Sequence, residues 1–390
     1  MKFFRALLFW SHLATGVTAG TVVLIMSVTG VLLTYEKQIT RWADTRALDG
    51  SPPSQDAKRL DVAALVARAR ATSTGAPTAV TWRAGANAPV EVAFGRERTV
   101  FLNAYTGATL GNGATGTRRF FRIVTDWHRW LGRDGPRRAL GKSITGVANL
   151  GFLFIVLSGL YLWWPRHWTR RTLRNVMLFR RGLRSKARDF NWHSVIGLWA
   201  WAPLVVIVAS GVVISFPWAS NAVYRAVGEK PPQARPPIAP TGPSASALDL
   251  SGLDALVARA EQRTPAWRSI TLTLPTRPDA PAVFAIDGGT GGQPQKRAEL
   301  HLDRASTAEL RWQPFSAGST GRRLRSVVRF AHTGEVLGIV GQTIAGLVSL
   351  GAVVLVYTGL ALAWRRLRKW TGRRQRFGAH GATRRAPARV

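Results

Sequence analysis

Stretches without a charged side chain alternate along the chain with mixed segments of polar and apolar residues. Four windows contain no Asp, Glu, Lys or Arg: Ala6–Tyr35, Ser143–Pro165, Phe190–Tyr224 and Val336–Trp364. Each exceeds the roughly 20 residues that a helix needs to cross the hydrocarbon core of a bilayer. The pattern therefore predicts an α-helical membrane protein with transmembrane helices at 6–35, 140–165, 190–220 and 336–364.

The two long segments between these windows carry shorter patterns. In the first, spanning 36–138, an amphipathic helix pattern at 60–71 is followed by strand-like runs at 78–83, 89–94 and 98–103. In the second, spanning 221–332, a Pro-rich linker (230–243) precedes a helix pattern at 253–262 and strand-like runs at 268–274, 282–287 and 298–303. We expect two small α+β units.

The positive charge is unevenly distributed. The chain has 54 Lys and Arg against 20 Asp and Glu, a formal charge of +34. A basic loop at 166–189 and a basic tail at 365–390 hold much of this excess, which by the positive-inside rule places both of them, and both termini, in the cytoplasm. The α+β units then lie outside. We interpret the charge as a topology signal and a contact with anionic lipids, not as nucleic-acid binding.

Ala6–Tyr35 is longer than the apolar core of a signal peptide, and no small-residue cleavage site follows it, so we expect it to be retained as the first transmembrane helix.

The chain contains an internal repeat. The sequence "ALVARA" occurs at 64–69 and again at 255–260. His12 is followed by glycines 4 and 18 residues later, and so is His193. Between the second and fourth windows a constant offset of 200 relates Gly141, Gly146, Gly151, Gly159 and Trp164 to Gly341, Gly346, Gly351, Gly359 and Trp364. This self-similarity predicts two parallel-duplicated halves, each a helix, an outer unit and a second helix.

Duplication places two histidines near each face of the membrane. His12 and His193 lie at the cytoplasmic ends of the first and third helices, whereas His128 and His332 lie outside, shortly before the second and fourth. Two imidazoles are the axial ligands of a low-spin haem suited to electron transfer. Because the chain has no cysteine, the haem would be of the b type, without thioether attachment. We predict two haem b groups forming an electron path across the bilayer.

Glycines accompany three of these histidines. Gly16, Gly197 and Gly132 each follow a histidine by four residues and would leave room for a porphyrin plane, whereas Val336 occupies that position after His332. The alternative is that the histidines only support helix ends. His167 is the one credible substitute ligand on the inner face. Zinc fits less well because few carboxylates and no thiolates accompany the histidines.

Arginines precede both outer histidines. Two roles are open for these arginines. They could contact lipid phosphates, or some of them could pair with haem propionates or attract an anionic substrate. The first group is Arg118, Arg119 and Arg122, and the second is Arg322, Arg323, Arg325 and Arg329.

Several motifs resemble a known family. The chain resembles PepSY-associated transmembrane proteins, among them bacterial ferric-siderophore reductases and iron-regulated inner-membrane proteins. The resemblance rests on "WHRWLG", "NWHSVIGLW" and "SGLYLWWP" and on the outer units "ALVARARA…VFLNAYTGATLG" and "ALVARAEQ…AELHLDRASTAEL". The resemblance implies PepSY-like periplasmic domains and a haem-bearing inner-membrane oxidoreductase that passes electrons to a periplasmic ferric chelate. Its ligands would be His12, His128, His193 and His332. The second unit departs from the pattern, with "DRAST" in place of "NAYTG".

Two other functions compete with this interpretation. The outer units of a haem-free protein could bind or regulate a periplasmic peptidase. A transporter is disfavoured because the windows hold almost no acidic or basic side chain to couple transport to an ion. No flavin or nicotinamide motif is visible, so an electron donor on the cytoplasmic side or in the membrane has to be supplied separately.

Overall fold

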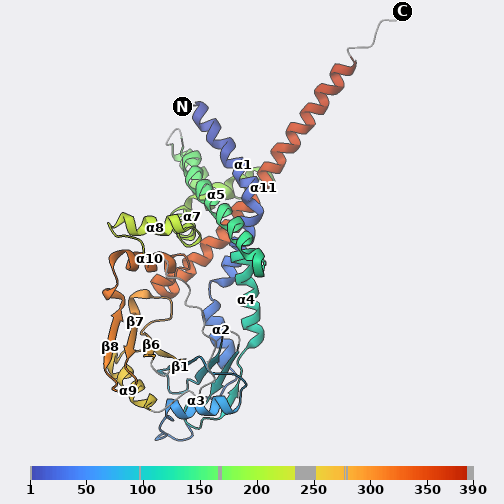
Figure 1. Ribbon diagram of the computed structural model, residues 1–390. Helices are drawn as coiled ribbons and strands as arrows, with labels where there is room; N and C mark the ends of the chain where they lie inside the picture. The colour runs from blue at the N-terminus through green and yellow to red at the C-terminus, as the bar shows by residue number, and fades with distance from the viewer. Residues whose placement is uncertain are drawn as a thin grey trace, which may run out of the picture. The chain divides into compact units, whose positions relative to one another are not determined.

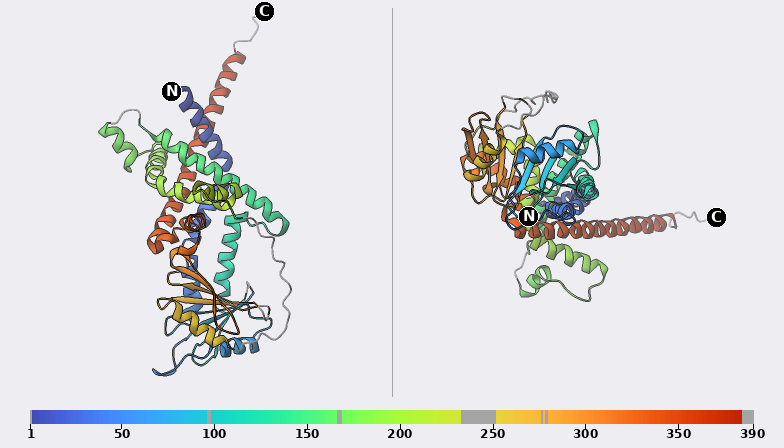
Figure 2. Two further views of the ribbon diagram at one scale, coloured as in Figure 1. Left: turned by 60° about the vertical axis from the view of Figure 1, so that its left-hand side comes forward. Right: turned by 90° about the horizontal axis from the view of Figure 1, so that it is seen from below.

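A computed structural model describes residues 2–95, 98–165, 169–232, 252–275, 277 and 280–383, with the backbone alone at 2 and 371–383. The chain divides into two compact units (Figures 1 and 2). The first, the membrane unit, takes in Met1–Thr34, Ile123–Phe216 and Gln342–Val390; the second, the sheet unit, takes in Tyr35–Arg122 and Pro217–Gly341. Most of the predicted Pro-rich linker lies outside the described residues.

The membrane unit is built on four long helices. They are α1 (Lys2–Leu33), α5 (Arg138–Trp163), α7 (Ser185–Ser215) and α11 (Gly338–Thr383), and each is long and apolar enough to span a membrane. The four predicted transmembrane helices are therefore confirmed. α5 packs against both α1 and α7. All four helices contribute to one apolar cluster, through residues such as Val23, Phe152, Leu204 and Val348.

Proline determines where α7 ends. The uncharged window continues to Tyr224, but the helix stops at Ser215 and a separate helix, α8 (Pro217–Ala226), begins at Pro217. Phe216 between them is extended (φ −116°, ψ 126°), because a residue before proline is disfavoured in the helical region. Two shorter helices lie next to these in the chain: α4 (Thr115–Trp130) precedes α5, and α6 (Arg170–Met177) lies between α5 and α7.

The sheet unit contains one eight-stranded antiparallel sheet in the order β4-β3-β2-β1-β5-β6-β7-β8. The strands are β1 (Ala79–Arg83), β2 (Val90–Phe94), β3 (Arg98–Leu102), β4 (Thr109–Gly111), β5 (Ser269–Thr273), β6 (Ala282–Asp287), β7 (Arg297–Leu302) and β8 (Glu309–Pro314). The six predicted strands are confirmed. The sequence did not indicate that β1 and β5, from different segments, pair in register and join both halves into one sheet.

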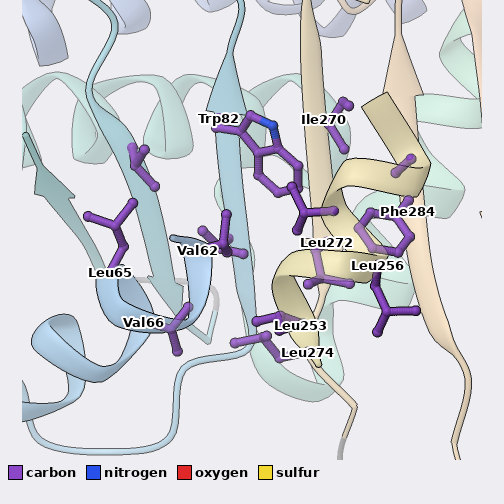
Figure 3. Close-up of a cluster of buried hydrophobic side chains, with 14 of the residues drawn as sticks. Val62, Leu65, Val66, Trp82, Leu253, Leu256, Ile270, Leu272, Leu274 and Phe284 are labelled. Atoms are coloured by element: carbon purple, nitrogen blue, oxygen red, sulfur yellow. The ribbon is translucent and has the colours of Figure 1, made fainter. Parts of the chain in front are cut away.

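Two helices cover one face of this sheet, α3 (Val62–Ala71) and α9 (Leu253–Arg263) (Figure 3). Each buries apolar residues at helical spacing, for example Leu65, Val66 and Ala69 in α3. Their side chains meet Trp82, Ile270, Leu272 and Phe284 from the strands in a single core.

The remaining helices of this unit are α2 (Glu36–Thr45), α8 and α10 (Thr320–Ala331), together with the first half of α4. Short 3₁₀ turns occupy Gly135–Arg137, Pro294–Lys296, Phe315–Ala317 and Glu335–Leu337.

The turn after β7 keeps its geometry without glycine. After β3, Gly107 adopts a left-handed conformation (φ 68°), and its amide donates to the carbonyl of Asn103. After β7, Thr307 adopts the same conformation (φ 59°), and its amide donates to the carbonyl of Asp303. "DRAST" therefore folds like "NAYTG", with a strained threonine where the first half has glycine.

Candidate functional site

His12 lies on α1 with its ring against α5. Its Nδ1 is 2.8 Å from the hydroxyl oxygen of Ser158. The next residue on α5 is Gly159, where a Cβ would lie 3.5 Å from Cε1 of the His12 ring. The glycine therefore lets the imidazole lie close to the backbone of α5.

His193 lies on α7 with the same arrangement against α11. Its Nδ1 is 3.0 Å from the hydroxyl oxygen of Thr358, and a Cβ at Gly359 would lie 3.4 Å from Cε1 of the ring. Ser158 and Gly159 precede Thr358 and Gly359 by the repeat offset of 200 residues. The two histidines are thus held by equivalent residues.

The structure brings His12 and His193 together in the membrane unit, close enough to interact electrostatically. In both rings the hydroxyl contact uses Nδ1, which leaves Nε2 as the nitrogen able to bind a metal. The pairing of these two histidines from helices far apart in sequence is the main geometric feature of the site.

Charged and polar residues before His193 fix α7 to its neighbours. The buried carboxylate of Asp189 accepts from Arg365 of α11 (2.6 Å) and from Arg188 (3.1 Å). The buried Asn191 accepts from the backbone amide of Arg180 and donates to the carbonyls of Asn175 in α6 and Leu178 just after it. These contacts hold the start of α7 beside α11, where His193 meets Thr358.

His128 repeats the arrangement towards the other end of α1. It lies near the end of α4, and its Nδ1 is 2.9 Å from the hydroxyl oxygen of Thr29. A Cβ at Gly30 would lie 3.7 Å from Cε1 of the His128 ring. His332 follows α10 as its C-cap residue and belongs to the sheet unit, so its pairing with His128 stays a prediction.

The glycines expected to make room for a cofactor differ in their surroundings. A Cβ at Gly16 would meet nothing within 4 Å, whereas one at Gly197 would touch Leu355 at 3.6 Å. Gly132 has a positive φ of 68° and its amide bonds the carbonyl of Asp126, so it terminates α4. The glycines that face histidine rings are Gly30, Gly159 and Gly359, which sequence analysis noted only as members of the repeat.

A cavity of about 690 Å³ in the sheet unit contains the first arginine group. Arg118, Arg119 and Arg122 line it together with Glu36 and other residues of α2 and α4. Burial raises the pKa of Glu36; neighbouring Lys37 opposes the shift and Glu335 adds to it. The cavity therefore combines a positive lining with a carboxyl group that is costly to ionise.

The arginines have different environments. Arg118 is committed to the structure, because its guanidinium donates to the buried Asp44 carboxylate at 2.7 Å. Arg119 and Arg122 have exposed side chains. In the second group, Arg325 donates to Ser220 and Arg329 lies over the ring of Phe330.

Among the remaining histidines, His301 is the one whose side chain the structure describes. His301, on β7, lies 2.5 Å from the carboxylate of Glu299. His167 lies outside the described residues, and the structure does not describe the side chain of His380. Within the described part of the chain, no three or more His, Cys, Asp or Glu side chains gather as a metal site.

A bundle of four candidate membrane-spanning helices with histidines held between them, and an antiparallel sheet domain covered by helices, define a polytopic membrane protein with an α+β domain. The chain belongs to the family described as the PepSY-associated TM region, whose sequence profile matches residues 9–366. A search of the curated proteins finds no match.

Proposed function

We propose that this protein is an electron-transfer protein of the bacterial inner membrane that holds two haem b groups and reduces a periplasmic ferric chelate, such as a ferric siderophore. The observation that carries the proposal is the pairing of His12 and His193 across the membrane unit, each with Nδ1 engaged by a hydroxyl. Their two Nε2 atoms are the donor set of a bis-imidazole haem, and the glycines against the rings suit a close-packed cofactor. The inner ligands are then His12 and His193, and the outer ligands His128 and His332.

A haem held by two imidazoles supplies reversible one-electron transfer between Fe(III) and Fe(II). The protein's part is to orient the imidazoles and exclude water. The apolar cluster shared by the four helices would limit the access of water to the interior of the bundle. On α1, Thr29, which contacts His128, follows His12 by 17 residues. The position of His12 and the contact point of His128 are therefore about 26 Å apart along the helix. This separation supports two sites near opposite faces of a bilayer.

We propose further that the chain is two parallel-duplicated halves, with both termini and the basic loop in the cytoplasm and the sheet unit in the periplasm. Equivalent contacts support the duplication. A Cβ at Gly151 would meet Thr15 and Ala19 of α1, while one at Gly351 would meet Ile196 and Ala200 of α7. The contacted residues differ by the 181 positions that also separate His12 from His193.

The reaction is a one-electron transfer from a reduced carrier at the cytoplasmic side or in the membrane to the ferric ion of the chelate. The carrier is oxidised by one electron and Fe(III) becomes Fe(II). Fe(II) binds hard oxygen donors less tightly, so the chelate releases the metal. The cavity lined by Arg119 and Arg122 would attract an anionic chelate. Arg122 precedes His128 by six residues on α4, or about 9 Å along the helix.

The first test is the absorbance spectrum and haem content of the full-length protein purified in detergent. We expect two haems per chain with a sharp reduced α-band, and the loss of one haem in His193→Ala and of the other in His332→Ala. His301→Ala is the matched control and keeps both, because His301 lies on β7 beside Glu299. The reduced protein should then be reoxidised by a ferric chelate in stopped-flow measurements. A colourless protein that takes up no haem would overturn the proposal and leave the sheet unit as a binding module.

A further inference from the structure

Three histidine contacts in the membrane unit share one local design. Ser158, Thr358 and Thr29 each place a hydroxyl within 3.0 Å of an Nδ1 atom. Each of these residues is followed directly by a glycine, and that glycine faces the same histidine ring. A side chain larger than a methyl group at the glycine would displace the ring, so the hydroxyl and the glycine act as a pair.

The hydroxyl protons in these pairs are already used within their own helices. Thr358 Oγ1 donates to the carbonyl of Val354 at 2.7 Å, and Thr29 Oγ1 donates to the carbonyl of Ile25 at 2.6 Å. Ser158 Oγ donates to the carbonyl of Ile155 at 3.2 Å. A hydroxyl has a single proton and two lone pairs, so each oxygen presents a lone pair to the imidazole. The hydrogen on the shared contact therefore comes from the histidine.

This donor count favours the Nδ1–H tautomer. A neutral imidazole that donates from Nδ1 has its lone pair on Nε2, the form that ligates a metal. The opposite tautomer would place two acceptors against each other, Nδ1 and the committed hydroxyl oxygen, and would occupy Nε2 with a proton.

We propose that three pairs, Thr29–Gly30, Ser158–Gly159 and Thr358–Gly359, are positioning residues that hold His128, His12 and His193 as Nδ1–H tautomers, the form in which Nε2 carries the lone pair. The assignment of these rings as haem ligands rests on the function proposed above, whereas the tautomer does not.

The pairs also influence a bound haem. A hydrogen-bond acceptor at Nδ1 makes the imidazole a stronger donor to the metal, which favours the more highly charged ferric state. Removing the hydroxyl weakens this donation, so the midpoint potential of that haem should rise.

The first experiment needs no haem. Full-length protein from haem-deficient cells, with ¹⁵N-labelled histidine rings, is placed in bilayers and the ring nitrogen shifts are measured by NMR. In the parent, the resonances lost in His12→Ala and His193→Ala should be those of Nδ1–H tautomers. In Thr358→Val the His193 signal should move towards the Nε2–H form, while Thr358→Ser retains the parent shift. Thr18→Val is the matched control, because Thr18 bonds back to Ala14 on α1 and is exposed. An unchanged His193 tautomer in folded Thr358→Val would overturn the proposal.

The second experiment is a redox titration of the haem-loaded protein. Thr358→Val should raise the potential of one haem and Thr29→Val that of the other, with Ser143→Ala, which loses only a bond to Ala139 on the exposed side of α5, changing neither. Unchanged potentials in Thr29→Val and Thr358→Val would overturn the role of these hydroxyls in positioning the haem ligands. If the protein binds no haem, the proposed function fails, and the NMR result alone decides the tautomer proposal.

Discussion

Trp82 tests whether the two halves of the sheet unit fold as one structure. It lies on β1 with 3% of its surface exposed, in the core covered by α3 and α9. Its Nε1 donates to the carboxylate of Glu261 on α9, in the other half, at 2.8 Å. Because β1 pairs with both β2 and β5, loss of this side chain weakens both halves.

Replacing a buried Trp by Ala costs about 3–5 kcal/mol of unfolding free energy, and each 1.4 kcal/mol is a tenfold change in an equilibrium constant. In Trp82→Ala, the open form of the whole sheet unit should therefore become roughly 100-fold to 4,000-fold more populated. Hydrogen exchange of the full-length protein in detergent measures this population at individual strands. Amides of β3 and of β7, on opposite sides of the β1–β5 joint, should accelerate by the same factor.

Trp42→Ala is the control, since Trp42 belongs to the same unit and is 59% exposed. It should change the opening free energy measured by hydrogen exchange by less than about 0.5 kcal/mol, as is usual for a surface substitution. Acceleration of β3 in Trp82→Ala with no change in β7 would refute the reasoning and show two independently folding domains.

Three further predictions concern other positions. Gly359→Val should lower the haem content by about one haem per chain without unfolding the protein, because the valine side chain would displace the His193 ring. The absorbance spectrum measures the haem content and circular dichroism checks the fold. An unchanged haem content would contradict the geometry. Thr307→Gly should raise the unfolding free energy of the sheet unit by about 1 kcal/mol in urea unfolding, because glycine adopts the left-handed conformation of residue 307 without the strain that threonine has there. A loss of stability would show that the threonine is not strained. Glu229, which follows α8, accepts hydrogen bonds from Ser319 and from the Gly321 amide at the start of α10, and these bonds lower the pKa of its carboxyl group. Their stabilisation should be present above about pH 4.5 and lost as the pH falls through the lowered pKa. Exchange of α10 amides should show this dependence in the parent and not in Glu229→Gln.

Much of the membrane unit could be predicted because charge is so costly in hydrocarbon that its absence marks the spans. The end of α7 could not be read from charge, since it depends on Pro217 within an uncharged window. His12 and His193 were identified by their equal spacing to glycines. Ser158 and Thr358 were not, because hydroxyl residues are ordinary in membrane helices and only the neighbouring helix reveals their partner.

The strands of the sheet unit were predictable from their alternation, but their order was not. β1 has the alternating burial of a strand with one covered face, a pattern that fits an edge as well as a centre. Which edges meet depends on shape and register over the whole unit, and Thr81 and Thr271 at the joint give no distinctive signal. The spacing of Gly132 from His128 predicts room for a porphyrin, and the structure adds that its left-handed φ lies at the end of α4, which spacing alone did not indicate.

The joint between β1 and β5 has one further consequence. The two strands run antiparallel with Thr81 opposite Thr271, their hydroxyls 2.8 Å apart, and three further strands extend outward on either side. This is the symmetry of an isologous dimer contact, in which a surface patch meets its own copy. Covalent linkage makes such an association intramolecular, so it no longer depends on protein concentration. Under the duplication proposed above, each copy is free to change independently, since its partner cannot dissociate. The presence of Thr307 in one turn and Gly107 in the other is a difference that strict dimer symmetry would forbid.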